Sequence, residues 1–197
     1  MTNTTYETSR LIIRPWNIDD FEDLHTLGNS ADVMKYLDKS QYTLEETMHV
    51  MNDYQDHMVL HGFGPMACIE KKSNVLIGAA ALRYLKGVPH LINKVEIGWR
   101  ISANYWGKGY AGEISQKLFE ISFLELNFDE VVAIVSEHNN KSIRALEKLG
   151  MTTILKNNFV EFVDGKYPLK IEIKKNTLKT KNQLNFNKIK DYAFFTF

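Results

Sequence analysis

The sequence predicts an α+β fold, in which helices flank a mixed and mostly antiparallel sheet. The first half of the chain has the pattern of one strand, two helices and then three strands, without repeating strand-helix units. After a helix that begins near residue 110, the second half adds one strand-helix pair and a final hairpin. This order argues against a doubly wound parallel sheet, because that fold alternates strands and helices throughout.

The chain opens with one strand and two helices. Residues 10–15 alternate enough to form a strand, and residues 19–27 read as a helix with acidic residues in its first turn. A second helix begins after Thr43, which forms a capping box with Glu46. Gly62 is expected to end this helix, because glycine readily adopts the left-handed conformation of a helix C-terminus.

Three strands follow these helices. Residues 65–71 and 75–84 are β-type runs separated by the polar stretch 72–74, which predicts a hairpin. A loop over residues 86–93 then leads into a strand over residues 94–101. Together the three strands predict an antiparallel meander.

A glycine-containing loop follows the third of these strands. Residues 106–111, with the sequence WGKGYA, open an amphipathic helix that runs over residues 110–126. Gly107 and Gly109 have no Cβ, so their backbone can take positive φ and approach a ligand closely. The unpaired N–H groups at the start of a helix suit an anion such as a pyrophosphate, and Lys108 adds a positive charge. The segment therefore predicts a phosphate-binding loop.

Two common phosphate-binding motifs do not fit this loop. A Walker A loop needs Ser or Thr directly after Gly-Lys, and Gly109 occupies that position. Gly107, Gly109 and Gly112 do spell the dinucleotide-binding pattern G-x-G-x-x-G. That pattern should begin a series of strand-helix units, but here half the chain precedes it and only one further pair follows.

The remaining elements complete the predicted sheet. Residues 129–136 form an apolar strand of the kind that is buried on both faces. A short helix over residues 140–149 ends at Gly150, and residues 151–163 and 167–174 form a final hairpin.

Three separated segments resemble the GNAT N-acetyltransferase superfamily, in particular its ribosomal-protein-alanine N-acetyltransferase-like branch. They are Thr8-Ser-Arg-Leu-Ile-Ile-Arg14, the loop at 106–111, and Asn139-Asn-Lys-Ser-Ile-Arg-Ala-Leu-Glu-Lys-Leu-Gly150. The superfamily places Gln or Arg at the first position of the loop, whereas this chain has Trp106, as the branch does. The resemblance implies the GNAT fold over residues 1–173, with splayed central strands, and leaves residues 174–197 as a lysine- and asparagine-rich tail.

The resemblance also implies acetyl-coenzyme A as the co-substrate. The six histidines do not form a metal-binding pattern with Cys68, so we expect no metal. It places the pantetheine arm between the strand at 94–101 and the strand at 129–136, like an added strand. The residues that it assigns to the cofactor are Trp99, Arg100, Ile101, Trp106, Gly107, Lys108, Gly109, Tyr110, Ala111, Asn139 and Ser142.

Acetyl transfer to an amine needs a base, because a protonated amine is not nucleophilic. Glu96, on the strand beside the expected acetyl group, is our candidate, with Glu137 as a rival. The alternative is that Glu96 is simply a surface or salt-bridged glutamate. Many GNAT enzymes have a tyrosine that assists the leaving thiolate, but Leu146 occupies its position here. The resembled branch uses a serine at the position of Ser142 instead, although Ser142 and Asn139 could equally be helix caps.

Composition sets further bounds on the function. The chain has 197 residues, 44% of them hydrophobic, which suits one domain with a real core. The tail holds six of the 24 basic side chains but one of the 24 acidic ones, so the body is mildly acidic and no direct nucleic-acid contact is expected. The single Cys68, the polar start and the lack of a long apolar run lead us to expect a cytoplasmic monomer or homodimer away from membranes.

The acceptor amine stays open at this point. An α-amine of a ribosomal or other protein is the expected acceptor, and polyamines or aminoglycosides are alternatives. A silent acyl-coenzyme A sensor would explain the missing tyrosine, and a partner-binding tail over residues 176–197 is a third possibility.

Overall fold

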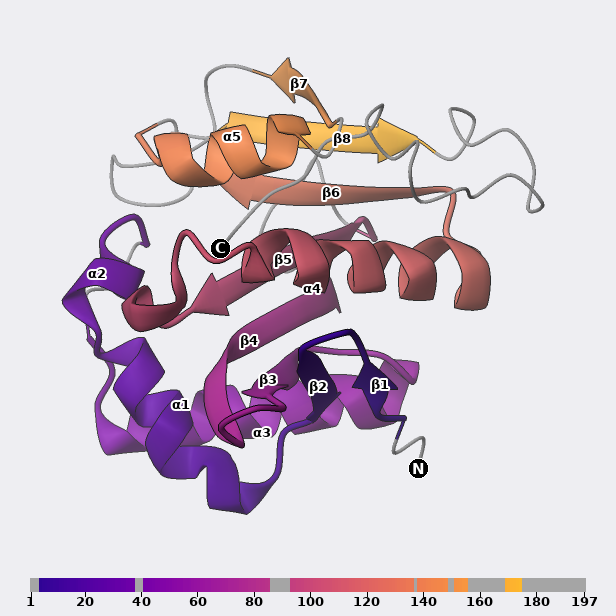
Figure 1. The fold of residues 1–197 in the computed structure, drawn as a ribbon. Coiled ribbons are helices and arrows are strands. Elements are labelled where there is room, and N and C mark those ends of the chain that lie inside the picture. The colour runs from indigo at the N-terminus through magenta and orange to yellow at the C-terminus, as the bar shows by residue number, and fades with distance from the viewer. Residues whose placement is uncertain are drawn as a thin grey trace.

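The computed structural model describes residues 4–37, 41–85, 93–136, 138–148, 151–155 and 169–174. Its strands form one sheet in the order β1-β2-β3-β4-β5-β6-β8-β7 (Figure 1). The strands are β1 (Tyr6–Glu7), β2 (Leu11–Pro15), β3 (Met66–Glu70), β4 (Val75–Tyr84), β5 (Val95–Ile101), β6 (Glu130–Val135), β7 (Thr152–Leu155) and β8 (Leu169–Lys174). The α-helices are α1 (Phe21–Gly28), α2 (Ala31–Met34), α3 (Leu44–His61), α4 (Tyr110–Phe119) and α5 (Asn140–Lys148). This mixed sheet with flanking helices confirms the predicted fold class.

Helices cover both faces of the sheet (Figure 1). The larger core lies on the face of α4 and α5, where Ile114, Leu118 and Leu146 are fully buried. The smaller core lies on the face of α1 and α3, around Leu24 and Met51. Val95, Ile97, Trp99 and Ile101 of β5 belong to the larger core. Because side chains alternate along a strand, Glu96, Gly98 and Arg100 face the opposite side of the sheet.

The predicted start and end of the second helix, α3, are confirmed. The side chain of Thr43 accepts a hydrogen bond from the backbone N–H of Glu46, and the carboxylate of Glu46 accepts one from the backbone N–H of Thr43. Gly62 ends α3 with φ of 75°. The predicted helix at 19–27 appears as a 3₁₀ turn over Ile18–Asp20 followed by α1.

The central strands diverge as the family resemblance implied. Strands β2 to β5 pair antiparallel in sequence order, so the predicted meander and hairpin are present. Strands β5 and β6 run parallel and share only one register pair, Glu96 with Val132. Beyond that pair, toward Ile101 and Val135, the two strands no longer form a ladder.

The C-terminal part completes the sheet in a different spatial order from its order along the chain. Strand β8 lies between β6 and β7 and pairs antiparallel with both. The predicted turn between the last two strands lies outside the described residues, as does the tail beyond Lys174. The division at residue 173 therefore stays a prediction.

The structure adds features that periodicity did not predict. The helix expected to run to residue 126 changes after Phe119 into a π-helix over Glu120–Glu125, where the N–H of Leu126 donates to the carbonyl of Ile121. The strand β1 and the short helix α2 were also not predicted. Within the described residues, no helix combines the length and apolar character needed to cross a bilayer.

Gly78 allows β4 to approach β5 closely at the end of β5 opposite to Glu96. A Cβ at this position would lie 2.1 Å from the carbonyl oxygen of Arg100 and 2.9 Å from the Cα of Ile101. Both contacts are with backbone, so Gly78→Ala should force the strands apart and lower the free energy of unfolding by about 3 kcal/mol. Urea unfolding would measure this loss.

Gly112→Ala provides the matched control for Gly78→Ala. Gly112 lies in α4, and no atom lies within 4 Å of an added Cβ there. Alanine should stabilise that helix by about 0.5–1 kcal/mol. Equal unfolding free energies for the two variants would contradict the close approach at Gly78.

Candidate active site

Glu96 lies buried at the last point where β5 and β6 pair. Glu96 is 2% exposed, and its Oε2 accepts a hydrogen bond from Nε of Arg83 at 3.2 Å. Arg83 is its direct partner across β4 and β5. Burial raises the pKa of the Glu96 carboxyl above its ordinary value, and the Arg83 guanidinium partly offsets this effect. The carboxylate is therefore held in one place and is a better proton acceptor than an exposed glutamate.

The sequence alone did not identify Arg83. The salt bridge that we considered for Glu96 is present and is buried, and it depends on the cross-strand register between β4 and β5. That register is a long-range pairing of two strands, which no local motif in the sequence specifies. The rival base Glu137 lies outside the described residues.

Beyond Glu96, successive residues of β5 direct their backbone N–H and C=O groups alternately toward β4 and toward β6. The N–H of Leu85 donates to the carbonyl of Lys94, and the N–H of Ser102 donates to the carbonyl of Ile77, so even-numbered positions of this segment face β4. Trp99 and Ile101 therefore direct their backbone groups toward the β6 side. The carbonyl of Ile101 accepts a hydrogen bond from the indole Nε1 of Trp106 at 2.7 Å.

The three predicted pantetheine contacts are consequently not equivalent. The carbonyl of Arg100 points toward β4, as its proximity to Gly78 shows. A contact from Arg100 would have to come from its half-buried side chain. Trp99 and Ile101 remain suited to backbone pairing with an extended ligand, while the indole of Trp99 is buried in the larger core.

The glycine loop has the conformation expected of a phosphate site. Gly107 and Gly109 have φ of 72° and 83°, a region that side chains with a Cβ rarely adopt. Gly109 is the N-cap of α4, and no side chain caps this helix. The first N–H groups of α4 and the exposed Lys108 therefore suit the diphosphate of acetyl-coenzyme A, which fits here.

The aromatic residues of the loop have separate roles. Trp106 is 38% exposed, and Nζ of Lys141 at the start of α5 lies 4.9 Å from its ring centre. The side chain of Tyr110 is buried, and its hydroxyl donates to Glu70. Tyr110 and Ala111 can therefore serve the cofactor mainly through their backbone N–H groups in the first turn of α4.

At the start of α5, the capping role belongs to Asn139. Its Oδ1 accepts a hydrogen bond from the backbone N–H of Ser142 at 3.2 Å, and its carbonyl accepts from Ile143. The structure thus shows the cap that we considered for Asn139 and does not show Ser142 as the cap. The Ser142 side chain is half-buried in the first turn of α5, and Leu146 is fully buried in the core.

Cysteine and histidine are two other reactive residue types, and Cys68 and His57 both have structural roles. Cys68 is fully buried in β3, and burial strongly raises the pKa of its thiol, so it is a poor nucleophile. Nδ1 of His57 lies 2.8 Å from the carbonyl of Phe63, and Nε2 of His57 accepts from the N–H of Tyr84. The described residues contain no cluster of His, Cys, Asp and Glu that could hold a metal.

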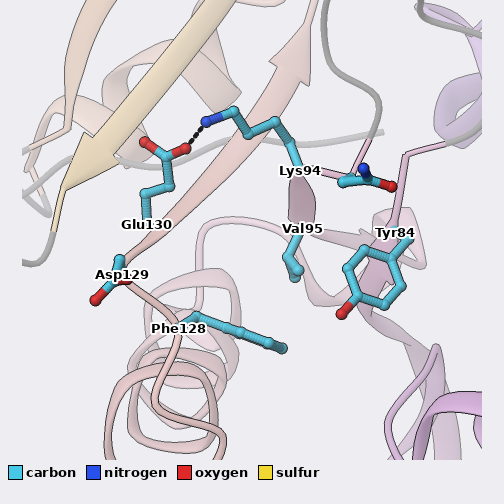
Figure 2. A pocket seen from close by; sticks show the side chains of 7 residues that line it. Tyr84, Lys94, Val95, Phe128, Asp129 and Glu130 are labelled. Atoms are coloured by element: carbon cyan, nitrogen blue, oxygen red, sulfur yellow. Dashed lines mark ion pairs between the residues drawn. The ribbon is translucent and has the colours of Figure 1, made fainter.

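A separate pocket lies at the other end of β5, away from the glycine loop (Figure 2). Its volume is about 330 Å³. Tyr84, Val95 and Phe128 point toward one another there, beside an ion pair between Lys94 and Glu130. None of the predicted site residues lines this pocket.

Comparisons with known proteins agree with this geometry. Residues 10–152 match the family model of the acetyltransferase (GNAT) domain. An uncharacterised N-acetyltransferase of Bacillus subtilis (strain 168) is 28% identical over 73% of this chain and 80% of its own length. The spermidine N(1)-acetyltransferase of Escherichia coli (strain K12) is 26% identical over 79% of this chain and 80% of its own length.

A solved structure shows the same architecture. The ribosomal-protein-S5-alanine acetyltransferase from Vibrio fischeri superposes with a TM-score of 0.71 at 15% identity, covering 90% of this chain and 100% of that one. The divergent strands, the glycine loop at a helix N-terminus and the family match lead to one conclusion. This chain belongs to the GNAT acetyltransferase family and is an acetyl-coenzyme A-dependent N-acetyltransferase.

Proposed function

We propose that this chain acetylates the α-amine at the N-terminus of a protein, by direct transfer in a ternary complex. The observation that carries the proposal is the buried Glu96, fixed by Arg83 where β5 and β6 begin to diverge. A carboxylate at this point lies beside an extended ligand that adds to β5. It is buried enough for its pKa to rise toward the range useful for a general base.

The residues of the chain have four tasks in this reaction. The glycine loop and the first turn of α4 hold the diphosphate, and the backbone of Trp99 and Ile101 orients the pantetheine arm. Acetyl-coenzyme A supplies a thioester, whose acetyl group passes to the amine nitrogen. Glu96 takes the proton that the amine loses, and the hydroxyl of Ser142 donates a hydrogen bond to the departing thiolate.

The charges around Glu96 favour an acceptor with a single amine. Arg83 is paired with Glu96, and Arg14 is paired with Asp20 by hydrogen bonds of 2.7 and 2.8 Å. Glu96 and Asp20 therefore each have a cationic partner within the protein. An N-terminal amine also has a pKa near ~8, compared with ~10.4 for a lysine-type amine, so it loses its proton more readily.

A small amine such as spermidine is the second candidate. It is favoured by the similarity to the spermidine N(1)-acetyltransferase of E. coli, which extends over most of both chains. A polyamine needs binding sites for its remaining cationic groups, and the mildly acidic body of the protein could supply them.

An acceptor panel tests the choice. The protein is incubated with acetyl-coenzyme A and, separately, a peptide with a free N-terminus, the same peptide with a blocked N-terminus and an internal lysine, spermidine, and an aminoglycoside. We expect release of free thiol with the first peptide, and mass spectrometry should place the acetyl group on its α-nitrogen. Turnover confined to spermidine or to the aminoglycoside would overturn the α-amine proposal in favour of a small amine.

A further inference from the structure

The turn between β1 and β2 lies directly against the first turn of α4, about one hundred residues away in sequence. Glu113 of α4 accepts hydrogen bonds from the hydroxyls of Thr8 at 2.5 Å and Ser9 at 3.0 Å. It also accepts one from the backbone N–H of Arg10 at 2.8 Å. One carboxylate thus anchors three consecutive residues of the N-terminal turn.

Arg10 extends this contact to the glycine loop itself. Its Nε donates to Oε2 of Glu113 at 2.6 Å, and its Nη1 donates to the carbonyl of Lys108 at 2.8 Å. Its guanidinium carbon lies 4.1 Å from the ring centre of Tyr110. Its Nη2 lies 3.5 Å from the position that a Cβ on Gly109 would take. The guanidinium therefore contacts or approaches three consecutive residues, 108 to 110.

The contacts that Arg10 makes with Glu113 and with residues 108–110, here called the clamp, can hold the glycine loop in one conformation before a ligand binds. Gly107 and Gly109 lose more conformational freedom on ordering than any other residue type, and no side chain caps α4. A ligand that had to order the loop by itself would bind more weakly, because ordering opposes binding. The planar guanidinium can hold a carboxylate, a carbonyl and a ring at once, which a lysine ammonium cannot reproduce.

The Glu113 carboxyl group in this contact is ionised above its lowered pKa. Burial alone would raise the pKa of Glu113, but hydrogen bonds from Thr8 and from the backbone and side chain of Arg10 outweigh it and hold that pKa below its usual value. Glu113 therefore remains a carboxylate beside the guanidinium of Arg10.

We propose that Arg10 is a positioning residue, which holds the glycine loop in the conformation that receives the diphosphate of acetyl-coenzyme A. It acts through the Lys108 carbonyl and Glu113 rather than by touching the reacting atoms. The inference rests on the assignment of residues 106–111 as the diphosphate site.

Arg10→Ala tests the proposal through binding and kinetics. The dissociation constant of coenzyme A, measured by calorimetry, should rise about tenfold, in line with loss of a charged hydrogen-bond network. The KM for acetyl-coenzyme A should rise in parallel, while kcat at saturating acetyl-coenzyme A stays within about twofold. Arg10→Lys should restore only part of the affinity, and Glu113→Gln should weaken binding in the same direction.

Lys71→Ala is the matched control. Lys71 fastens the same turn, since its Nζ donates to Glu7 and to the carbonyl of Thr8 at 2.7 Å each, but these contacts do not include residues 106–111. We expect a similar fall in melting temperature for Lys71→Ala and Arg10→Ala, with weaker coenzyme A binding only for Arg10→Ala. Unchanged affinity in Arg10→Ala would overturn the positioning role.

The failure of this proposal can be separated from a failure of the loop assignment. Gly109→Val alters the loop directly without replacing Arg10 or Glu113. If Gly109→Val weakens coenzyme A binding and Arg10→Ala does not, the loop assignment stands and the positioning role is wrong. If neither variant weakens coenzyme A binding, both the loop assignment and the positioning role of Arg10 are wrong.

Discussion

Glu96→Gln is expected to lower kcat/KM for the amine about a hundredfold near neutral pH, because general bases commonly contribute 10² to 10⁴-fold. Glutamine preserves the shape of the side chain and can still accept a hydrogen bond from Arg83, but it cannot take a proton. The base works only when ionised, so wild-type activity should fall as the pH drops through the raised pKa of Glu96. A profile of kcat/KM against pH should therefore show an acidic limb above the usual glutamate range near ~4.3.

The variant should lack this limb. Its deficit should also narrow as the pH approaches the pKa of the acceptor amine, since more of the amine is then neutral without help. If the glutamine variant keeps the same acidic limb, the base is another group. Melting temperatures of both proteins would establish that the comparison is between folded enzymes.

Arg83→Gln is the companion variant. The positive charge of Arg83 lowers the pKa of Glu96, so its removal should move the acidic limb to higher pH without abolishing activity on the alkaline side. A limb that stays in place would contradict electrostatic control of Glu96 by Arg83.

Local signals in the sequence predicted most of the fold. The capping box at Thr43, the helix end at Gly62 and the hairpin between β3 and β4 depend on a few adjacent residues, and each is present. The π-helix after Phe119 was not predicted, because its apolar spacing resembles that of an α-helix over so short a run. The position of β8 between β6 and β7 depends on long-range pairing, which no local pattern records.

The same division applies to the site. Positive φ at Gly107 and Gly109 could be predicted, since only glycine is common there and the loop precedes a helix. The partners Arg83 of Glu96 and Arg10 of Glu113 could not, because they come from strands brought together by folding. The family resemblance supplied the divergence of β5 and β6, which the apolar pattern of either strand does not contain.

Gly109→Val should weaken coenzyme A binding roughly ten- to a hundredfold. The space around Gly109 is not the obstacle, because an added Cβ would meet only Nη2 of Arg10, at an ordinary 3.5 Å. The obstacle is φ of 83°, which a β-branched residue rarely adopts, so the loop must change its course. A loss of one charged hydrogen bond of about 1.5–3 kcal/mol corresponds to that range of affinity. Calorimetry with coenzyme A measures it.

Gly62→Val separates the effect of the loop from the cost of backbone strain. Gly62 has φ of 75° at the end of α3, and no atom lies within 4 Å of an added Cβ there. Valine should thus introduce a comparable strain at a position outside the glycine loop, and destabilise the protein without changing the affinity for coenzyme A. Equal losses of coenzyme A affinity in the two variants would mean that general destabilisation explains both. A loss of affinity confined to Gly109→Val is the result expected if the diphosphate binds the backbone where this loop enters α4.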